Sequence, residues 1–320
     1  VLSGHLREVK SVAFSSSGRL LASAGNDHTA ILWNVGTGQP LHMLRGREGP
    51  CLAGGELKEE QKFRDYVARI YSFGFHKECL EVLKGDRAVE WDENASIELG
   101  GIDGGIHGYK IPKKVPMGTD VTGDGTPDLV VGSYSGGAHC CYLVEVFEIG
   151  DQFRHVAQLP PSPRGPGETP DWHSGVGFED VDKDGKLEAI TRDWNFAYWG
   201  PFSFAESPAP EVILRFREGV FRLAVELMRK PAPATSDLES RAQQFRDSKE
   251  WEVLVLSDLV REVLDLIYSG NASSAWQLFE SGWPPRREGR DEFRLKLLEA
   301  LAASPYWRDL VELNGNRLEL

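Results

Sequence analysis

The chain has 320 residues, which is enough for two or three domains with packed cores. Its 49 acidic side chains outnumber its 36 basic ones and give a formal net charge of -13 at pH 7. Since an acidic surface repels phosphate backbones, we expect no nucleic-acid partner, and a cation becomes the natural ligand to look for. No apolar run approaches the roughly 18 residues of a membrane-spanning helix, so we expect no membrane span.

Residues 1–46 predict a small antiparallel sheet. Turn-forming Ser, Gly, Asn and Asp separate four short strands, which we expect at residues 11–14, 20–23, 29–33 and 41–44. These strands and their turns carry a set of marker residues: Gly4, His5, Ser23, Asp27, Trp33 and Asn34. The set resembles a WD40 repeat, which forms one propeller blade of about 40 to 45 residues, although here Asn stands where Asp is usual at the last marker.

The WD40 resemblance implies a structural role for four of these markers. In such a blade one hydrogen-bonded network ties the strands together, and here it would consist of His5, Ser23, Asp27 and Trp33. A propeller needs about four to eight blades, and no second unit with the same markers follows. We therefore expect the end of a longer propeller, a blade completed by a partner chain, or an accidental gene fusion. The chain begins with Val1 rather than Met, which indicates an N-terminus that is missing or was removed.

Composition divides the rest of the chain. Residues 47–60 hold Gly, Pro and charged side chains and are predicted to be a linker. Residues 61–232 are expected to form a β domain, with hairpins at residues 79–91 and 142–159. Beyond a Pro-rich break, residues 233–320 have the apolar spacing of helices. The predicted fold class is therefore mainly β, a propeller-blade unit plus a β-rich domain, with a C-terminal α-helical segment.

The acidic middle of the chain contains one nine-residue pattern twice, at residues 120–128 and 180–188. Positions 1, 3, 5 and 9 carry oxygen-bearing side chains, and position 6 is Gly, which accepts the positive φ of a sharp turn. Calcium takes six to eight oxygens, which these side chains, a carbonyl at position 7 and one or two waters would supply. The predicted calcium ligands are Asp120, Thr122, Asp124, Thr126 and Asp128 in the first loop and Asp180, Asp182, Asp184, Lys186 and Glu188 in the second.

An EF-hand is excluded because its Glu at position 12 is replaced by Val131 and Thr191, and strand-like residues follow. The loops resemble instead the calcium loops of FG-GAP and VCBS repeats, over about residues 115–200. The second loop has more carboxylates and is expected to bind calcium more tightly. An alternative remains open, in which both loops are Asp/Gly turns whose carboxylates cap backbone N–H groups without a metal.

Four cysteines are too few for a disulfide scaffold and lack the CxxC spacing of a structural zinc site. A bond between the adjacent Cys140 and Cys141 would be strained. One of these two could bond to Cys51 or Cys79 in an oxidising compartment, and four buried thiols are the alternative. We favour an extracytoplasmic location because extracellular calcium would fill the loops, with the cytoplasm as the alternative.

Two further clusters of residues are candidate functional sites. Trp194, Phe196 and Tyr198 would share one face of a strand, either as part of the core or as a platform for sugars or Pro-rich peptides. Asp171, His173 and Glu179 lie close in sequence, but no Gly-x-Ser-x-Gly elbow, His-Glu-x-x-His motif or phosphate loop accompanies them.

We therefore predict a non-enzymatic, calcium-stabilised binding or interaction protein with a protein partner, and carbohydrate as a further ligand class. One alternative function is a calcium-dependent hydrolase acting on polysaccharide or peptidoglycan through His173 and Glu179. The other is an intracellular WD40-type scaffold.

Overall fold

The computed structural model describes residues 5, 9–25, 29–45, 51, 55–102, 113–136, 141–161, 175–248, 251, 253–315 and 317–318. The chain forms two compact units. The first unit comprises Val1–Ile102, Lys114–Thr119 and Thr126–Trp172, and the second comprises Asp103–Lys113, Asp120–Gly125 and His173–Leu320. Each unit is described by itself below.

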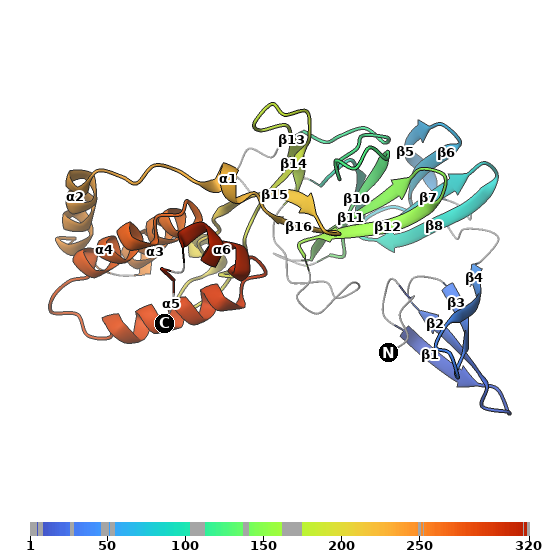
Figure 1. Cartoon of the computed structure of the whole chain (residues 1–320), viewed down its shortest axis with the longest axis horizontal. Coiled ribbons are helices and arrows are strands. Elements are labelled where there is room, and N and C mark those ends of the chain that lie inside the picture. The colour runs from blue at the N-terminus through green and yellow to red at the C-terminus, as the bar shows by residue number, and fades with distance from the viewer. Residues whose placement is uncertain are drawn as a thin grey trace. The chain divides into compact units, whose positions relative to one another are not determined.

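Four four-stranded antiparallel sheets follow one another along the described chain, and each is a meander of consecutive strands (Figure 1). Three of them belong to the first unit. The first sheet consists of β1 (Val9–Phe14), β2 (Leu20–Gly25), β3 (Thr29–Asn34) and β4 (Pro40–Arg45). The second consists of β5 (Glu56–Phe63), β6 (Tyr66–Ser72), β7 (Glu78–Lys84) and β8 (Arg87–Asn94). The third consists of β9 (Ser96–Leu99), β10 (Asp128–Tyr134), β11 (Tyr142–Ile149) and β12 (Phe153–Leu159).

The β1–β4 sheet has the strands and the network that the WD40 markers predict. Trp33 Nε1 donates a hydrogen bond to Ser23 Oγ at 2.7 Å, and His5 Nε2 lies 2.6 Å from the same oxygen. Asp27, the fourth predicted member, lies outside the described residues. The Oδ1 atom of Asn34 accepts hydrogen bonds from two N–H groups of the β3–β4 turn. Asn34 thus supplies an oxygen acceptor, as an Asp would.

The second and third sheets share one hydrophobic core. Side chains on one face of each sheet are withdrawn from solvent, among them Tyr66, Ile70, Leu80, Leu129 and Phe147. Both predicted hairpins are present, as β7–β8 and β11–β12. β5 begins at Glu56, so the last part of the predicted linker at residues 47–60 is the first part of a strand. Only one face of this edge strand is covered, so charged residues occupy its other face. The sequence of β5 therefore lacks the apolar run that would have indicated a strand.

The second unit combines the fourth sheet with the helices. The sheet consists of β13 (Gly177–Glu179), β14 (Glu188–Arg192), β15 (Glu211–Arg217) and β16 (Val220–Leu223). The 3₁₀ helix η2 (Phe204–Glu206) lies between β14 and β15. The helices are α1 (Val225–Met228), α2 (Thr235–Arg246), α3 (Val253–Tyr268), α4 (Ala272–Gly282), α5 (Arg290–Ala303) and α6 (Trp307–Asn314).

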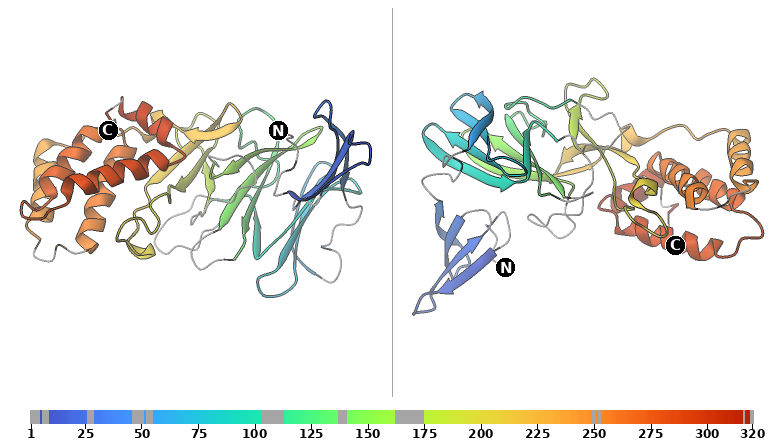
Figure 2. Two further views of the ribbon diagram at one scale, coloured as in Figure 1. Left: turned by 90° about the horizontal axis from the view of Figure 1, so that it is seen from below. Right: turned by 180° about the vertical axis from the view of Figure 1, so that it is seen from behind.

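The helices α2 to α6 lie side by side, as all of the views show (Figures 1 and 2). α4 packs against both α2 and α3, while α6 contacts β16. The predicted fold class, mainly β with a C-terminal helical segment, is confirmed. In the described residues, no helix has the length and apolar character needed to cross a bilayer.

Two expectations about side chains were wrong. The aromatic residues Trp194, Phe196 and Tyr198 do not lie on a strand, because β14 ends at Arg192 and the chain then turns. Trp194 and Phe196 are buried, as a core role predicts, but Tyr198 is exposed. Cys51 and Cys79 form a disulfide with each other, so neither pairs with Cys141, which is itself disulfide-bonded.

Candidate metal centre

The two acidic loops occupy equivalent places in two sheets. Each nine-residue pattern ends on the first residue of its sheet's second strand, since Asp128 begins β10 and Glu188 begins β14. Both of these position-9 carboxylates are buried. The 60-residue sequence repeat is therefore a repeat of the same structural element.

The backbone of the two loops is also the same. The glycines at position 6, Gly125 and Gly185, have φ of +90° and +89°. Position 4 is left-handed in both loops as well, with +72° at Gly123 and +64° at Lys183. The sharp turn that the pattern predicts at position 6 is confirmed, and a second left-handed residue precedes it.

The first aspartate of each loop accepts hydrogen bonds from backbone N–H groups of its own turn. Asp120 accepts hydrogen bonds from the N–H groups of Gly123 (2.6 Å) and Gly125 (2.8 Å). Asp180 accepts them from Asp184 (3.1 Å) and Gly185 (3.2 Å). These bonds are the backbone capping that the metal-free alternative predicts. An ionised carboxylate has about four lone-pair sites, so capping leaves acceptor capacity for a cation.

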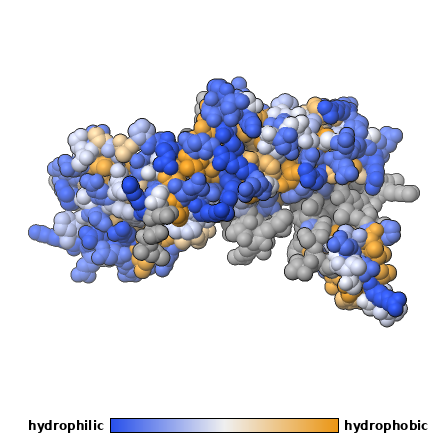
Figure 3. All heavy atoms as spheres, in the orientation of Figure 1, coloured by the Kyte–Doolittle hydropathy of each residue, from blue (hydrophilic) through white to orange (hydrophobic). Residues whose placement is uncertain are grey.

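In the second loop three carboxylates converge. One oxygen each from Asp180, Asp182 and Glu188 lies within 4.8 Å of the other two. Asp184, a predicted ligand, is not part of this group, and its Oδ1 accepts the N–H of Lys186 at 2.8 Å. Glu188 is fully withdrawn from solvent and accepts the N–H of Val181 at 3.0 Å. The surface over the β13–β14 loop is hydrophilic (Figure 3).

The first loop differs in composition. Thr122 Oγ1 donates to Asp120 Oδ1 at 3.2 Å, and Asp124 is exposed. These three residues belong to the second compact unit, whereas Thr126 and Asp128 belong to the first. Among the described residues, a group of three converging acidic side chains is found in the second loop. The candidate metal centre therefore lies at residues 180–188.

Arg215 on β15 is the main residue that sequence reasoning missed. Its guanidinium contacts Asp182, Asp184 and Glu188 of the second loop. Burial alone would lower the pKa of Arg215, but hydrogen bonds to Glu188 and Asp182 outweigh it and raise the pKa. The hydrogen bond from Arg215 also lowers the pKa of Asp182. The alternation of side chains along β15 predicts that Arg215 and Arg217 share one face of the strand. It does not predict that this face lies beside the second loop.

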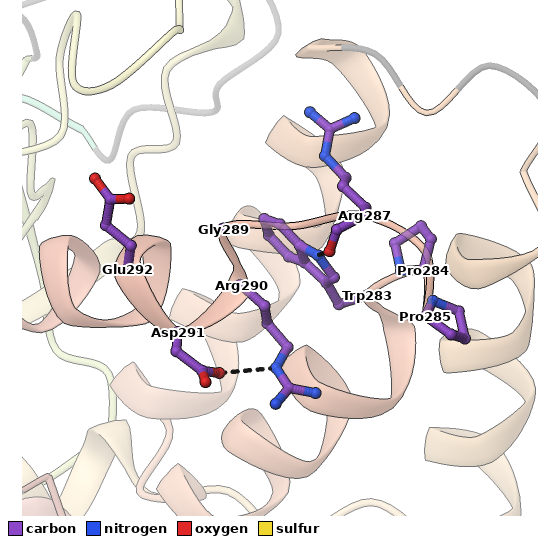
Figure 4. A pocket seen from close by; sticks show the side chains of 8 residues that line it. All are labelled: Trp283, Pro284, Pro285, Arg287, Gly289, Arg290, Asp291 and Glu292. Carbon is purple, nitrogen blue, oxygen red and sulfur yellow. Dashed lines mark hydrogen bonds and ion pairs between the residues drawn. The ribbon is translucent and has the colours of Figure 1, made fainter.

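The hydrolase alternative gains no support from the described residues. Asp171 and His173 lie outside them, and Glu179 is exposed on β13. A separate pocket of about 350 Å³ lies between α4 and α5 (Figure 4). There Trp283 Nε1 donates to the carbonyl of Arg287, and Arg290 pairs with Asp291. These polar groups are engaged with near neighbours in the chain, so the pocket does not define a reactive site.

Comparison with known proteins identifies two repeat segments. Residues 1–34 match the family model for the WD domain, G-beta repeat, and residues 120–191 match that for the FG-GAP-like repeat. The chain therefore contains a WD40 repeat and an FG-GAP-like repeat, as its motifs predict. Such repeats are typical of proteins that bind other proteins or act as scaffolds, and are typically non-enzymatic.

Whole-chain comparisons add little. No curated protein matches this chain. It is similar to a crystal structure of the WD40 domain of coronin from Toxoplasma gondii, with 11% identity and a TM-score of 0.22. That match covers 69% of this chain and 46% of the coronin chain, and a TM-score this low supports no argument about the fold.

Proposed function

We propose that the protein is a non-enzymatic binding protein whose β13–β16 sheet is stabilised by calcium in the second acidic loop. The observation that carries this proposal is the convergence of Asp180, Asp182 and Glu188 around a turn with left-handed Gly185. Asp184 and the carbonyl of Lys186 would complete the ligand set. The first loop, at residues 120–128, is proposed as a second site of the same kind.

The donor set fits a hard cation. All of the side-chain donors are oxygens, which suit calcium or magnesium rather than the soft metals that prefer Cys or His. The loop concentrates four carboxylates, one of them buried, and a bound calcium ion supplies positive charge that relieves their repulsion. The loop connects the first two strands of the sheet, so an ion bound by its carboxylates would link these strands. Calcium here is structural.

The proposed role in protein interaction is supported by the WD40 repeat, whose first strand exposes apolar side chains. Val12 and Phe14 share one face of β1 and are exposed by 60% and 64%, a costly arrangement for a surface that stays in water. This exposure supports a protein partner. The Cys51–Cys79 disulfide favours an oxidising, extracytoplasmic compartment over the cytoplasm.

Thermal unfolding with and without calcium tests the proposal. Adding calcium at about one hundred times its Kd stabilises the folded state by about 2.7 kcal/mol, which we expect to raise Tm by about 5 °C or more. Asp182→Ala together with Asp184→Ala should abolish most of this rise. Asp258→Ala, on the exposed surface of α3, is the matched control and should keep it. A wild-type Tm that calcium leaves unchanged would contradict the proposal.

A further inference from the structure

The sheet itself fixes Arg215 beside the second loop. β14 and β15 pair antiparallel with Ala189 opposite Leu214, and the same register puts Glu188 opposite Arg215. Directly opposite side chains on one face of a sheet are close enough to interact. The position of this guanidinium is therefore set by strand pairing rather than by a surface loop.

The guanidinium occupies oxygens that the metal proposal assigns to calcium. Its Nε donates to Glu188 Oε1 at 2.8 Å, and its Nη2 donates to Asp182 Oδ2 at 3.0 Å. Nη2 also lies 3.6 Å from Asp184 Oδ2. Of the four predicted side-chain ligands of this loop, Asp182, Asp184 and Glu188 make these contacts with Arg215, and Asp180 does not take part in them. The Arg215 side chain is only 16% exposed and Glu188 is fully buried, so solvent screens this ion pair weakly, whereas the partners Asp182 and Asp184 are exposed.

Two cations cannot share these oxygens. A guanidinium and a calcium ion a few ångströms apart repel each other strongly in a partly buried site. Arg215 also occupies one oxygen of Asp182 and one of Glu188, and the other oxygen of each carboxylate already accepts a backbone N–H group. Binding of calcium by this loop therefore requires that Arg215 withdraw from it.

A second partner for the guanidinium is already in place on α1. Arg215 Nη1 donates to Glu226 Oε1 at 3.0 Å, and Glu226 is half exposed. Arg217, two residues along the same face, also pairs with Glu226. A rotation of the Arg215 side chain can keep the contact with Glu226 while it releases the loop.

We propose that Arg215 is a tethered competitor of calcium: it holds Asp182 and Glu188 in the metal-free protein and passes to Glu226 when the loop binds the ion. This inference rests on the proposed calcium site. It keeps the loop ordered without metal, and it lowers the calcium affinity of the second loop below what its carboxylates alone would give. The expectation that the second loop binds more tightly than the first then holds only once Arg215 is removed.

Calorimetric titration of the full chain with calcium chloride tests the inference. Asp120→Asn and Asp124→Asn are introduced first, so that the second loop alone reports. In this background we expect Arg215→Gln to bind calcium about tenfold more tightly, a coupling of ordinary size between two ligands of one site. Arg215→Lys keeps the positive charge but loses the planar guanidinium group with its paired N–H donors. Its calcium affinity should therefore lie between those of the parent and of Arg215→Gln. Arg217→Gln removes the same charge from the same strand face and should stay within about threefold of its parent.

Each outcome bears on one of the two proposals. Circular dichroism shows whether Arg215→Gln folds without calcium. If this variant folds only with calcium, Arg215 takes the place of the ion in the metal-free protein, and this result supports the inference. Arg215→Lys then supplies the affinity comparison. Equal or weaker calcium binding by both Arg215 variants overturns the inference and leaves the calcium site intact. Absence of calcium binding at the second loop in the parent and in every variant overturns the proposed calcium site itself.

Discussion

The two ends of β14 each carry a carboxylate that is fully withdrawn from solvent. At the first end, Glu188 is ion-paired with Arg215. At the other end, just after the strand, Asp193 has neutral partners. Its Oδ2 accepts hydrogen bonds from the hydroxyls of Tyr268 (2.6 Å) and Ser304 (2.5 Å), and its Oδ1 accepts the N–H of Asn195 (2.9 Å).

The difference between these acids separates the binding role that we propose for Glu188 from a structural role of Asp193. Burial raises the pKa of Asp193, and the hydrogen bonds from Ser304, Tyr268 and Asn195 offset this only in part. Tyr268 is on α3 and Ser304 directly follows α5, so Asp193 ties the sheet to two helices. Glu188 is paired with Arg215 at the base of an acidic loop, and in our proposal it exchanges this partner for calcium.

Removal of the Asp193 carboxylate should have the largest effect on stability. Asp193→Ala leaves two buried hydroxyls and one N–H group without their acceptor, and we expect a loss of about 3 kcal/mol in the free energy of unfolding. Tyr268→Phe removes only one of these hydrogen bonds and should cost about 1 kcal/mol. Urea unfolding followed by circular dichroism measures both. The Tm rise with calcium should survive in both variants, and its loss would refute the division of roles.

A side chain at Gly185 should have a smaller effect, confined to the acidic loop. A Cβ there would meet no atom within 4 Å, so only the left-handed backbone is strained, at about 1 kcal/mol for Gly185→Ala. The same reasoning holds for Gly219, with φ of +82° in the β15–β16 turn. Thermal unfolding should show similar losses for both variants. Calcium titration should show weaker binding for Gly185→Ala alone, and equal weakening in both would contradict a site in this loop.

The smallest expected effect is a pH dependence. Because the pKa of Asp193 is raised in the folded protein, the folded state holds this proton at pH values where the unfolded state has lost it. The contribution of Asp193 to stability is therefore full below the unfolded pKa of about 3.9 and declines as pH rises through the folded pKa. Urea unfolding from about pH 4 to neutrality should show wild type losing stability relative to Asp193→Asn. A relative gain would reverse the assigned pKa direction.

The sequence predicted the features that depend on near neighbours. Gly at position 6 and Asp at position 1 determine the acidic turns because their hydrogen bonds span only a few residues. The resemblance to a WD40 repeat implied the contacts of Ser23 with His5 and Trp33, all of which lie within one short segment of the chain. Strand-like runs separated by the Gly-Asp turns at residues 85–86 and 150–151 predicted both hairpins of the β domain.

Only the tertiary structure decided which distant groups meet these local elements. Arg215 reaches the loop through a strand pairing 27 residues beyond Glu188, and Ser304 reaches Asp193 across 111 residues. Neither contact can be recognised from a periodic pattern in the sequence. Strand register and helix packing depend on which whole faces of the strands and helices are buried, and not on single residues. The local pattern therefore specifies an acidic turn, and the packing of distant elements determines that Arg215 lies against it.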